Sequence, residues 1–415
     1  MPATRDTDPV TGRRRDAWGM LLLFGILIGV NQMLVLNFAP LVTTVQARYG
    51  VSDFPAGLLT LMNPITYLVF GFYAGTALDR YGYKTVVTAA AAVMTLGAFG
   101  RSLESGYSVL LATHTLVAVS GVFITSAIGK FVSDWFAPAH IGLATGIVMA
   151  LMLLGTGVGM GATPSFMAWI GWQRTLLSFA VLALAATVLF ALWSREQRHT
   201  TLAAEVTGLQ EARYLWGQTN LRRVFWLSFL IIGATNGINA WFEKIMSGNG
   251  FDPATAGAII GVSLLCSVVG AAVVPALSDR WRRRRPFILM ATVFGLSFTY
   301  LFLNTSSFAL AAGIAGAGGI FQLPSYILLV ALAAQIAGPA HAGLANGILM
   351  FANSLGGLII AVLMERVGQW FGWHNSAVVL MAVYLLGFFI ALQLREPTES
   401  RRDTAAPAVL SDGSV

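Results

Sequence analysis

Amide side chains stand in the apolar stretches of this sequence, at positions where charged side chains are absent. Asn236 and Asn239 are three residues apart and are therefore predicted to lie on one face of a helix. An amide donates and accepts hydrogen bonds without carrying a charge, so this set suits the binding of a solute better than acid–base chemistry. The set comprises Asn31, Gln32, Asn236, Asn239, Gln322 and Asn353.

Aromatic side chains in the same stretches are the expected partners of these amides in a binding site. They are Tyr67, Trp241, Phe321 and Tyr326. A second interpretation is open for every residue of both sets. Amides also bond across membrane helices, at about 0.6 kcal/mol per pair, and aromatic rings pack in any apolar core.

His114 is the one histidine inside an apolar stretch. Its side chain titrates near neutral pH when unperturbed, so it is a candidate for proton coupling or for gating a substrate. The alternative is a neutral histidine that is hydrogen-bonded to a neighbouring helix. A co-transported proton therefore stays open as a partner.

The sequence predicts no catalytic or metal centre. The 18 acidic residues lie in tails, in loops or at the ends of the apolar stretches. Cys266 is the single cysteine, which excludes disulfides and clustered thiolate metal sites. No phosphate loop and no nucleophile–base pair is visible. We expect neither enzymatic activity nor a cofactor, and an uncharged centre suits a neutral, zwitterionic or singly charged solute.

Composition sets the class of protein that must position these residues. Hydrophobic residues make up 56% of the 415 positions and charged residues only 10%, whereas soluble proteins carry about 25% charged residues. This excludes a soluble enzyme. The net charge of +7 is scattered between apolar runs, unlike the basic patch of a nucleic-acid-binding domain. The chain is predicted to be a monomeric membrane protein with many spans.

Windows of about 20 apolar residues give twelve predicted spans. They run near 18–40, 54–78, 85–103, 107–131, 141–168, 174–194, 223–246, 254–278, 286–304, 307–334, 342–365 and 374–394. If the N-terminus is cytoplasmic, 20 of the 25 basic residues fall on the cytoplasmic side. This asymmetry predicts that both termini face the cytoplasm, in a bacterial cytoplasmic membrane.

The chain is predicted to be a duplication. The segment from Pro138 to Gly146 recurs as Pro339 to Gly347, and Asp79-Arg80 recurs as Asp279-Arg280. Two parallel six-span repeats are an architecture of secondary transporters. The predicted parts are a cytoplasmic tail (1–17), a six-helix bundle (18–194), a cytoplasmic linker (195–222), a second six-helix bundle (223–395) and a second tail (396–415).

The residues between the second and third spans resemble a family signature. Gly75, Asp79-Arg80, Gly82 and Lys84 are similar to the loop 2–3 motif of the major facilitator superfamily. Trp135-Phe136 and the glycine-rich segment after it are similar to that family's loop 4–5 sequence. The resemblance covers 17–396 and implies an all-α fold of twelve transmembrane helices that works by alternating access. It also implies an inner gate, formed by Asp79, Arg80, Lys130, Asp279 and Arg280.

A weaker resemblance is to the FLVCR-type haem/choline carriers. It rests on Asn31-Gln32, Tyr49-Gly50-Val51, Asn239-Ala240-Trp241-Phe242, and Phe321 with Pro324. Met33, Leu34 and Val35 stand where aromatic residues would cage a choline head group, so the sequence departs from that pattern.

The predicted function is transport of a small organic solute. A multidrug or toxic-compound exporter is one alternative, although the membrane carboxylate that such a protein would use is missing. Gly155, Gly157, Gly159, Gly161 and Pro164 faintly resemble an exporter-type motif, but close packing explains them equally. The other alternative is a membrane sensor with the same fold and no transport activity.

Overall fold

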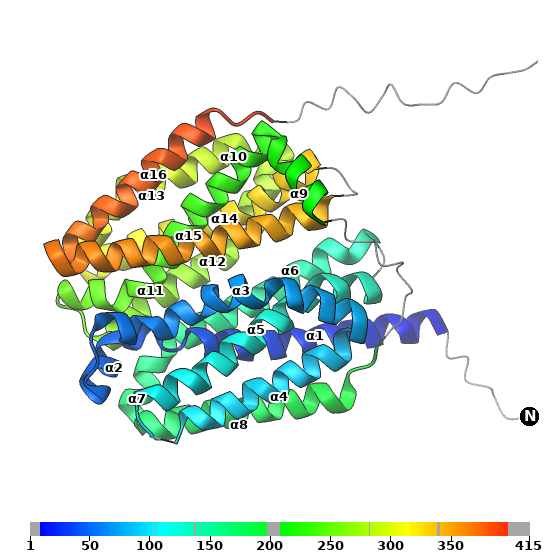
Figure 1. Cartoon of the computed structure of the whole chain (residues 1–415), viewed down its shortest axis with the longest axis horizontal. Helices are drawn as coiled ribbons and strands as arrows, with labels where there is room; N and C mark the ends of the chain where they lie inside the picture. The colour runs from blue at the N-terminus through cyan, green and yellow to red at the C-terminus, as the bar shows by residue number, and fades with distance from the viewer. Residues whose placement is uncertain are drawn as a thin grey trace, which may run out of the picture.

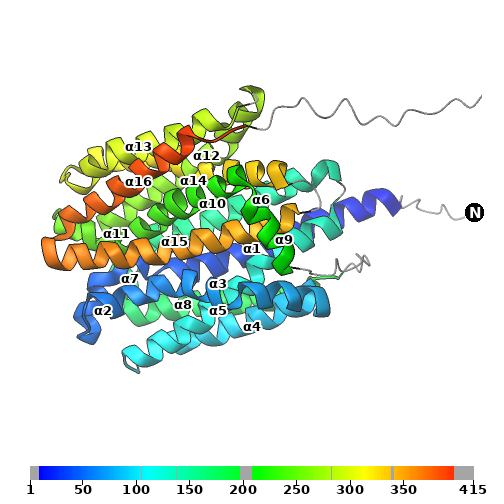
Figure 2. The ribbon, with the colours of Figure 1, turned by 45° about the horizontal axis from the view of Figure 1, so that its top comes forward.

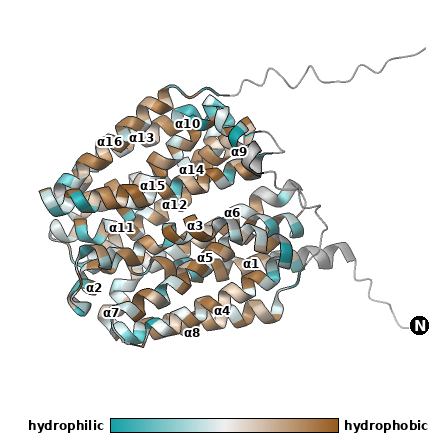
Figure 3. Cartoon of the chain, viewed as in Figure 1, coloured by the Kyte–Doolittle hydropathy of each residue, from teal (hydrophilic) through white to brown (hydrophobic). Residues whose placement is uncertain are grey.

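The computed structural model describes residues 9–103, 105–136, 138–196, 208–281, 283–337 and 341–396. In these ranges the chain forms helices and no strand. The helices make two bundles that lie side by side, the first formed by α1 to α8 and the second by α10 to α16 (Figures 1 and 2). Hydrophobic residues run along the helices of both bundles (Figure 3).

The first half contains α1 (Pro9–Leu36), η1 (Ala39–Leu41), α2 (Val42–Tyr49), α3 (Asp53–Tyr81), α4 (Tyr83–Arg101), α5 (Tyr107–Trp135), α6 (Pro138–Gly157), η2 (Val158–Ala162), α7 (Thr163–Ile170) and α8 (Trp172–Trp193). The second half, with the linker helix, contains α9 (Gly208–Gly217), α10 (Thr219–Leu227), η3 (Ser228–Ile232), α11 (Gly233–Gly248), α12 (Pro253–Trp281), α13 (Arg285–Leu303), α14 (Phe308–Ala337), α15 (Ala342–Phe371), η4 (Trp373–Asn375) and α16 (Ser376–Leu392).

Twelve membrane spans are consistent with these helices. Among the described residues, ten stretches are long and apolar enough to cross a bilayer. The apolar helices α13 and α16 provide the remaining two, and the 17 residues of α16 lie at the short end of the range for a spanning helix. The predicted all-α fold of two six-span repeats is confirmed. We call the ends of the helices predicted to face the cytoplasm the inner ends, and the opposite ends the outer ends.

The first span differs from its predicted boundaries at both ends. Helix α1 begins at Pro9, inside the segment predicted as a tail, and it ends at Leu36 rather than near residue 40. Beyond it the chain bends through η1 into α2, and Pro40 in η1 has no N–H with which to continue the α-helix. The guanidinium of Arg101 donates a hydrogen bond to the Leu34 carbonyl (2.8 Å) near this end of α1.

Glycines bring helix backbones into direct contact within the first half. A β-carbon added at Gly155 of α6 would lie 2.0 Å from the backbone oxygen of Gly29 in α1, and one at Gly159 would lie 2.6 Å from the oxygen of Met33. Gly161 faces Gly257 of α12 across the boundary between the halves. These contacts favour close packing as the explanation for the glycines of the fifth span.

The two halves meet at their outer ends. Lys244 of α11 forms an ion pair with Asp53 of α3 (2.8 Å) and donates a hydrogen bond to Gln46 of α2 (3.0 Å). Gly57 of α3 packs against Trp241, because an added β-carbon there would lie 2.3 Å from the indole ring. In Figure 1, α2 and α11 accordingly lie next to each other at one end of the molecule. These contacts hold α2 and α3 of the first half against α11 of the second half.

Candidate functional site

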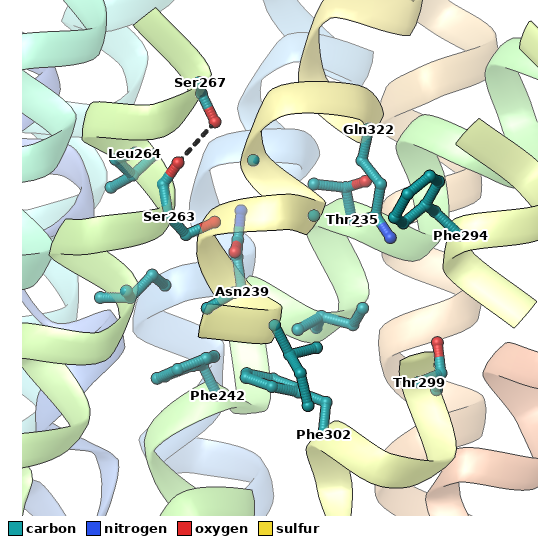
Figure 4. A pocket seen from close by; sticks show the side chains of 16 residues that line it. Thr235, Asn239, Phe242, Ser263, Leu264, Ser267, Phe294, Thr299, Phe302 and Gln322 are labelled. Atoms are coloured by element: carbon teal, nitrogen blue, oxygen red, sulfur yellow. Dashed lines mark hydrogen bonds between the residues drawn. The ribbon is translucent and has the colours of Figure 1, made fainter. Parts of the chain in front are cut away.

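A cavity of about 90 Å³ lies within the second half, between α11, α12, α13 and α14 (Figure 4). Its lining is polar without being charged: amide and hydroxyl groups face it together with phenylalanine rings. The polar lining residues are Thr235, Asn239, Ser263, Ser267, Thr299 and Gln322, and the rings are those of Phe242, Phe294 and Phe302. No charged side chain of the described residues lines this cavity.

Asn239 and Gln322 are the two amides in this cavity. Neither amide group has a described hydrogen-bond partner in another side chain, so the capacity of both to donate and accept stays available. The hydroxyl of Ser267, in contrast, donates to the Ser263 carbonyl (2.8 Å). Figure 4 shows Asn239 near Ser263 and Gln322 beside Phe294. The cavity therefore presents two unused amides between aromatic walls.

The rotation of α11 decides which of its amides enters the cavity. Thr235, Asn239 and Phe242 line it at helical spacing. Asn236 lies about 60° away around the helix and donates instead to the amide oxygen of Asn353 in α15 (2.8 Å). The sequence predicted that Asn236 and Asn239 lie on one face of the helix. In the structure Asn236 contacts α15, whereas Asn239 faces the cavity. A π-helical turn, η3, precedes this segment of α11.

A second polar cluster surrounds the Asn236–Asn353 bond. The buried hydroxyl of Tyr326 faces Asn353 and lies near Tyr67 of the first half, without completing a hydrogen bond to a described atom. Tyr67 itself shares a hydrogen bond with Thr125. Residues from both halves thus meet here, but their polar groups mostly bond to one another.

Asn31 and Gln32 are both buried in the first half. The Asn31 amide donates to the Ser120 hydroxyl (3.4 Å) and approaches the Met94 sulfur (3.4 Å). Gln32 is 8% exposed and has no described polar partner. Neither residue lines the described cavity, because α1 belongs to the other half. In this conformation Asn31 forms a hydrogen bond between helices, which is the alternative to a role in solute binding.

Trp241 also lies outside the cavity. Its indole is fully buried, donates to the Ala361 carbonyl (2.8 Å) and packs against Trp373 at 5.2 Å between ring centroids. Phe242, the next residue along the helix, lines the cavity in its place. Phe321 stacks on Phe294, one of the cavity rings, at 4.4 Å. Trp241 therefore packs α11 against α15 and the first half.

His114 is part of a buried network that the sequence did not reveal. Its Nε2 lies 2.8 Å from the Leu59 carbonyl and its Nδ1 lies 3.2 Å from a nitrogen of the Arg101 guanidinium. A carbonyl can only accept and a guanidinium can only donate. Nε2 must therefore carry the proton and Nδ1 must accept, which fixes a neutral imidazole.

Arg101 is the cation that sequence reasoning missed. It is the last residue of α4 and one of the five basic residues that do not fall on the predicted cytoplasmic side, yet it is only 2% exposed. Its side chain turns back into the bundle, where it donates to Asn37 (3.2 Å) and stacks over Phe38 (5.5 Å). The interruption of α1 at Leu36 provides its acceptors, and the sequence shows that interruption only as Asn37 and Pro40.

We predict that replacing His114 with Gln leaves the pH profile of transport unchanged. A second proton, on Nδ1, would place an N–H donor against the N–H donor of Arg101. This histidine is therefore held neutral and does not take up a second proton in this conformation. The measurement is uptake into proteoliposomes across a pH series, compared with the wild type. A flattened profile in the variant would restore His114 as a coupling residue.

The predicted inner-gate residues form their described contacts within their own halves. Lys130 donates to the Leu78 carbonyl (3.0 Å), and Arg80 stacks over Tyr81. Asp279 lies 3.8 Å from the Arg284 guanidinium, and Arg280 is exposed. The Asp79 side chain lies outside the described residues. Partial burial lowers the pKa of Arg284, against the opposing effect of the Asp279 and Glu396 carboxylates.

Two glutamates that the sequence analysis did not select join this inner region. Glu396 accepts hydrogen bonds from the backbone N–H groups of Arg284 (2.7 Å) and Arg285 (2.6 Å), at the start of α13. Glu196 lies against Gly82 at the start of α4, where φ is +80° and an added β-carbon would meet the carboxylate. Arg195-Glu196 recurs as Arg395-Glu396, with the same spacing as the two Asp-Arg pairs. This recurrence of Arg-Glu is the sequence signal that could have identified Glu196 and Glu396.

The described residues contain no group of three or more His, Cys, Asp or Glu side chains that could hold a metal ion. The polar groups that face the cavity are neutral amides and hydroxyls, which are suited to binding a solute by hydrogen bonds. Among the described residues that line the cavity there is no carboxylate, imidazole or amine.

Comparison with known proteins identifies the family. The family model described as Major Facilitator Superfamily matches residues 21–246 and 224–412. The 2-nitroimidazole transporter of Escherichia coli (strain K12) is 23% identical over 90% of this chain and 94% of its own. The choline/ethanolamine transporter flvcr2b of Danio rerio is 21% identical over 93% of this chain and 85% of its own. The weaker resemblance to the FLVCR-type carriers is therefore also confirmed.

A solved structure supports the same fold. The crystal structure of a mutant of the nucleoside transporter NupG superposes with a TM-score of 0.75 at 13% identity, over 91% of this chain and all of that one. At this identity the likeness shows the fold alone. Together with the family match over both halves, it completes the assignment: the chain belongs to the major facilitator superfamily and is a multi-pass membrane transporter.

Proposed function

We propose that this protein carries a small organic solute, neutral, zwitterionic or singly charged, across the bacterial cytoplasmic membrane by alternating access. One observation carries the proposal. The cavity between α11 and α14 presents the unused amides of Asn239 and Gln322 and contains no described charged side chain. A multiply charged solute would lose its hydration there without a partner of opposite charge.

The size of the cavity limits what it holds in this conformation. An apolar cavity of about 150 Å³ accommodates benzene, and this one measures about 90 Å³. It therefore holds only one hydrogen-bonding part of a solute. When the helices rearrange, the site extends toward the first half through the second polar cluster, which surrounds Asn236, Asn353 and Tyr326.

The named substrates of the relatives fit the same limits. Choline carries a single positive charge, ethanolamine gains one when protonated, and 2-nitroimidazole is a small planar ring. Each can hydrogen-bond to an amide, and an aromatic wall attracts a quaternary ammonium through cation–π contact. These compounds are the first to test on this chain.

The proposed cycle uses the contacts at both ends. With the outer ends of the halves joined, the solute exchanges with the inner side. The inner gate of Asp79, Arg80, Lys130, Asp279 and Arg280 would form when the outer ends separate. In this proposal both termini face the cytoplasm, the protein works as a monomer, and nucleic acid takes no part.

Counterflow in proteoliposomes tests the proposal. Vesicles loaded with unlabelled choline, ethanolamine, 2-nitroimidazole or a nucleoside are diluted into a trace of the same labelled compound. Transient accumulation with at least one compound is the expected result. Absence of flux with every solute of a wider panel would favour a membrane sensor, and flux of many unrelated compounds would favour a multidrug exporter.

A further inference from the structure

A buried carboxylate joins the two halves at their outer ends. Glu243 of α11 accepts a hydrogen bond from the backbone N–H of Thr43 (3.0 Å) and a second one from the Thr43 hydroxyl. Glu243 is 0% exposed. Glu243 lies near the end of the predicted seventh span (223–246), and the transport site described above does not use it.

Helix α2 provides the donors for this carboxylate. Thr43 is the second residue of α2, so its N–H has no acceptor within the helix. The N-terminus of a helix also carries a partial positive charge that favours a nearby anion. The bend of the chain after Leu36 aims this helix end at the other half, and Glu243 supplies the missing acceptor.

Lys244, the residue after Glu243, begins a chain of charged groups that continues through Asp53 to Glu365 and Arg366. Lys244 pairs with Asp53 of α3, and Gln46 of α2 donates to the same Asp53 carboxylate (2.6 Å). Glu365 of α15, which is 2% exposed, lies close enough to Asp53 to interact with it electrostatically. Glu365 pairs with Arg366 at 3.8 Å. Glu243 and its neighbours thus link α2 and α3 of one half with α11 of the other.

Thr43 and Glu243 occupy equivalent positions in the two repeats. They are 200 residues apart. The same spacing relates Gly50 to Gly250, which both have positive φ, and the first residue of α3 to the first residue of α12. Parallel repeats of this kind are related by an axis along the membrane normal. Equivalent residues can touch each other only where they lie on that axis.

We propose that Glu243 and Thr43 form the outer gate of the transport pathway, on the pseudo-two-fold axis. This inference rests on the proposed function, because it assigns the two residues a place in alternating access. The bond closes the outer mouth above the repeat interface. A solute enters from or leaves to the outer side only after Glu243 has separated from α2, and Glu243 then becomes hydrated.

The experiment measures the distance between the outer ends of the halves without any substrate. Spin labels are attached to cysteines that replace Ser105 and Ser306, which are exposed in corresponding outer loops, in a Cys266→Ser background. Double electron–electron resonance then gives the distance distribution in nanodiscs. For Glu243→Gln we expect a new population that is longer by several ångströms, because an amide has one acceptor oxygen for the two donors of Thr43.

Further variants distinguish the effect of losing the hydrogen bond from the effects of a changed charge and of misfolding. Thr43→Val removes the hydroxyl but keeps the N–H, so a smaller shift in the same direction is expected. Thr43→Ser keeps both donors and should match the wild type. Asp252→Asn removes an exposed outer carboxylate, whose pKa is held below its usual range by hydrogen bonds from Thr255, and should change nothing.

The outcomes distinguish this gate from the proposed function. Unchanged distances in both Glu243→Gln and Thr43→Val would overturn the gate, whether or not the protein transports a solute. An equal shift in Asp252→Asn would also overturn it, because the effect would then follow outer charge. A longer population in the two gate variants supports the gate even if counterflow detects no flux.

Discussion

Replacing Gly155 with Ala is expected to destabilise the protein by about 3 kcal/mol, the upper part of the range for overpacking. The added β-carbon would lie 2.0 Å from the backbone oxygen of Gly29. This oxygen belongs to a helix backbone and cannot rotate away, so α1 and α6 must separate. Their separation would also disturb the neighbouring contact of Gly159 with Met33.

The control for this prediction is the same substitution at Gly146, in the same helix. An added β-carbon there meets no atom within 4 Å. Alanine favours a helix over glycine by about 1 kcal/mol, so Gly146→Ala should be neutral or slightly stabilising. The measurement is the fraction of monodisperse protein that survives a temperature series in detergent. Equal curves for the two variants would show that α1 and α6 do not pack as described.

Replacing Asn239 with Ala is expected to lower kcat/KM for transport by about 10-fold to 100-fold. The amide faces the cavity with its hydrogen-bonding groups unused, and the loss of one hydrogen bond to a buried solute costs about 1–3 kcal/mol. The fold should be unaffected, since Asn239 bonds to no described side chain. Initial rates of uptake into proteoliposomes measure the effect, with melting curves as the check on folding.

The matched control is Asn304→Ala. Asn304 is exposed at the end of α13, where its amide donates to the Tyr300 carbonyl (2.8 Å), and its removal should leave uptake unchanged. Asn236→Ala gives the discriminating comparison, because Asn236 bonds to Asn353 rather than facing the cavity. A large loss of uptake in Asn236→Ala with none in Asn239→Ala would move the site to the cluster at the repeat interface.

Much of the fold could be predicted from the sequence, because it depends on local properties. The thickness of a bilayer sets the length of an apolar helix, so windows of apolar residues located the spans. The repeat of Asp-Arg and of the segment at Pro138 gave the two halves. The interruption of α1 was missed because Asn37 and Pro40 stand in an apolar run that reads as one span.

The candidate site was predicted only in part. Asn239 and Gln322 were selected as isolated amides in apolar stretches, and the structure brings these two together. The hydroxyl residues Ser263 and Ser267 and the rings of Phe294 and Phe302 were not selected. Such residues occur throughout apolar helices, so only their convergence on one cavity marks them.

The sequence by itself determined the membrane class, the twelve spans, the duplication and the absence of charge from the centres of the spans. Each of these follows from hydrophobicity and spacing along one chain. Only the tertiary structure decided which way each side chain points. Asn236 bonds to Asn353 while Asn239 faces the cavity. The Arg101 side chain points into the bundle, and Glu243 accepts hydrogen bonds from Thr43 of the other half. The rotation of a helix about its axis is set by its neighbours, through glycine contacts and hydrogen bonds between distant segments. A rotation of about 60° is enough to move an amide from the packing between helices into a binding site.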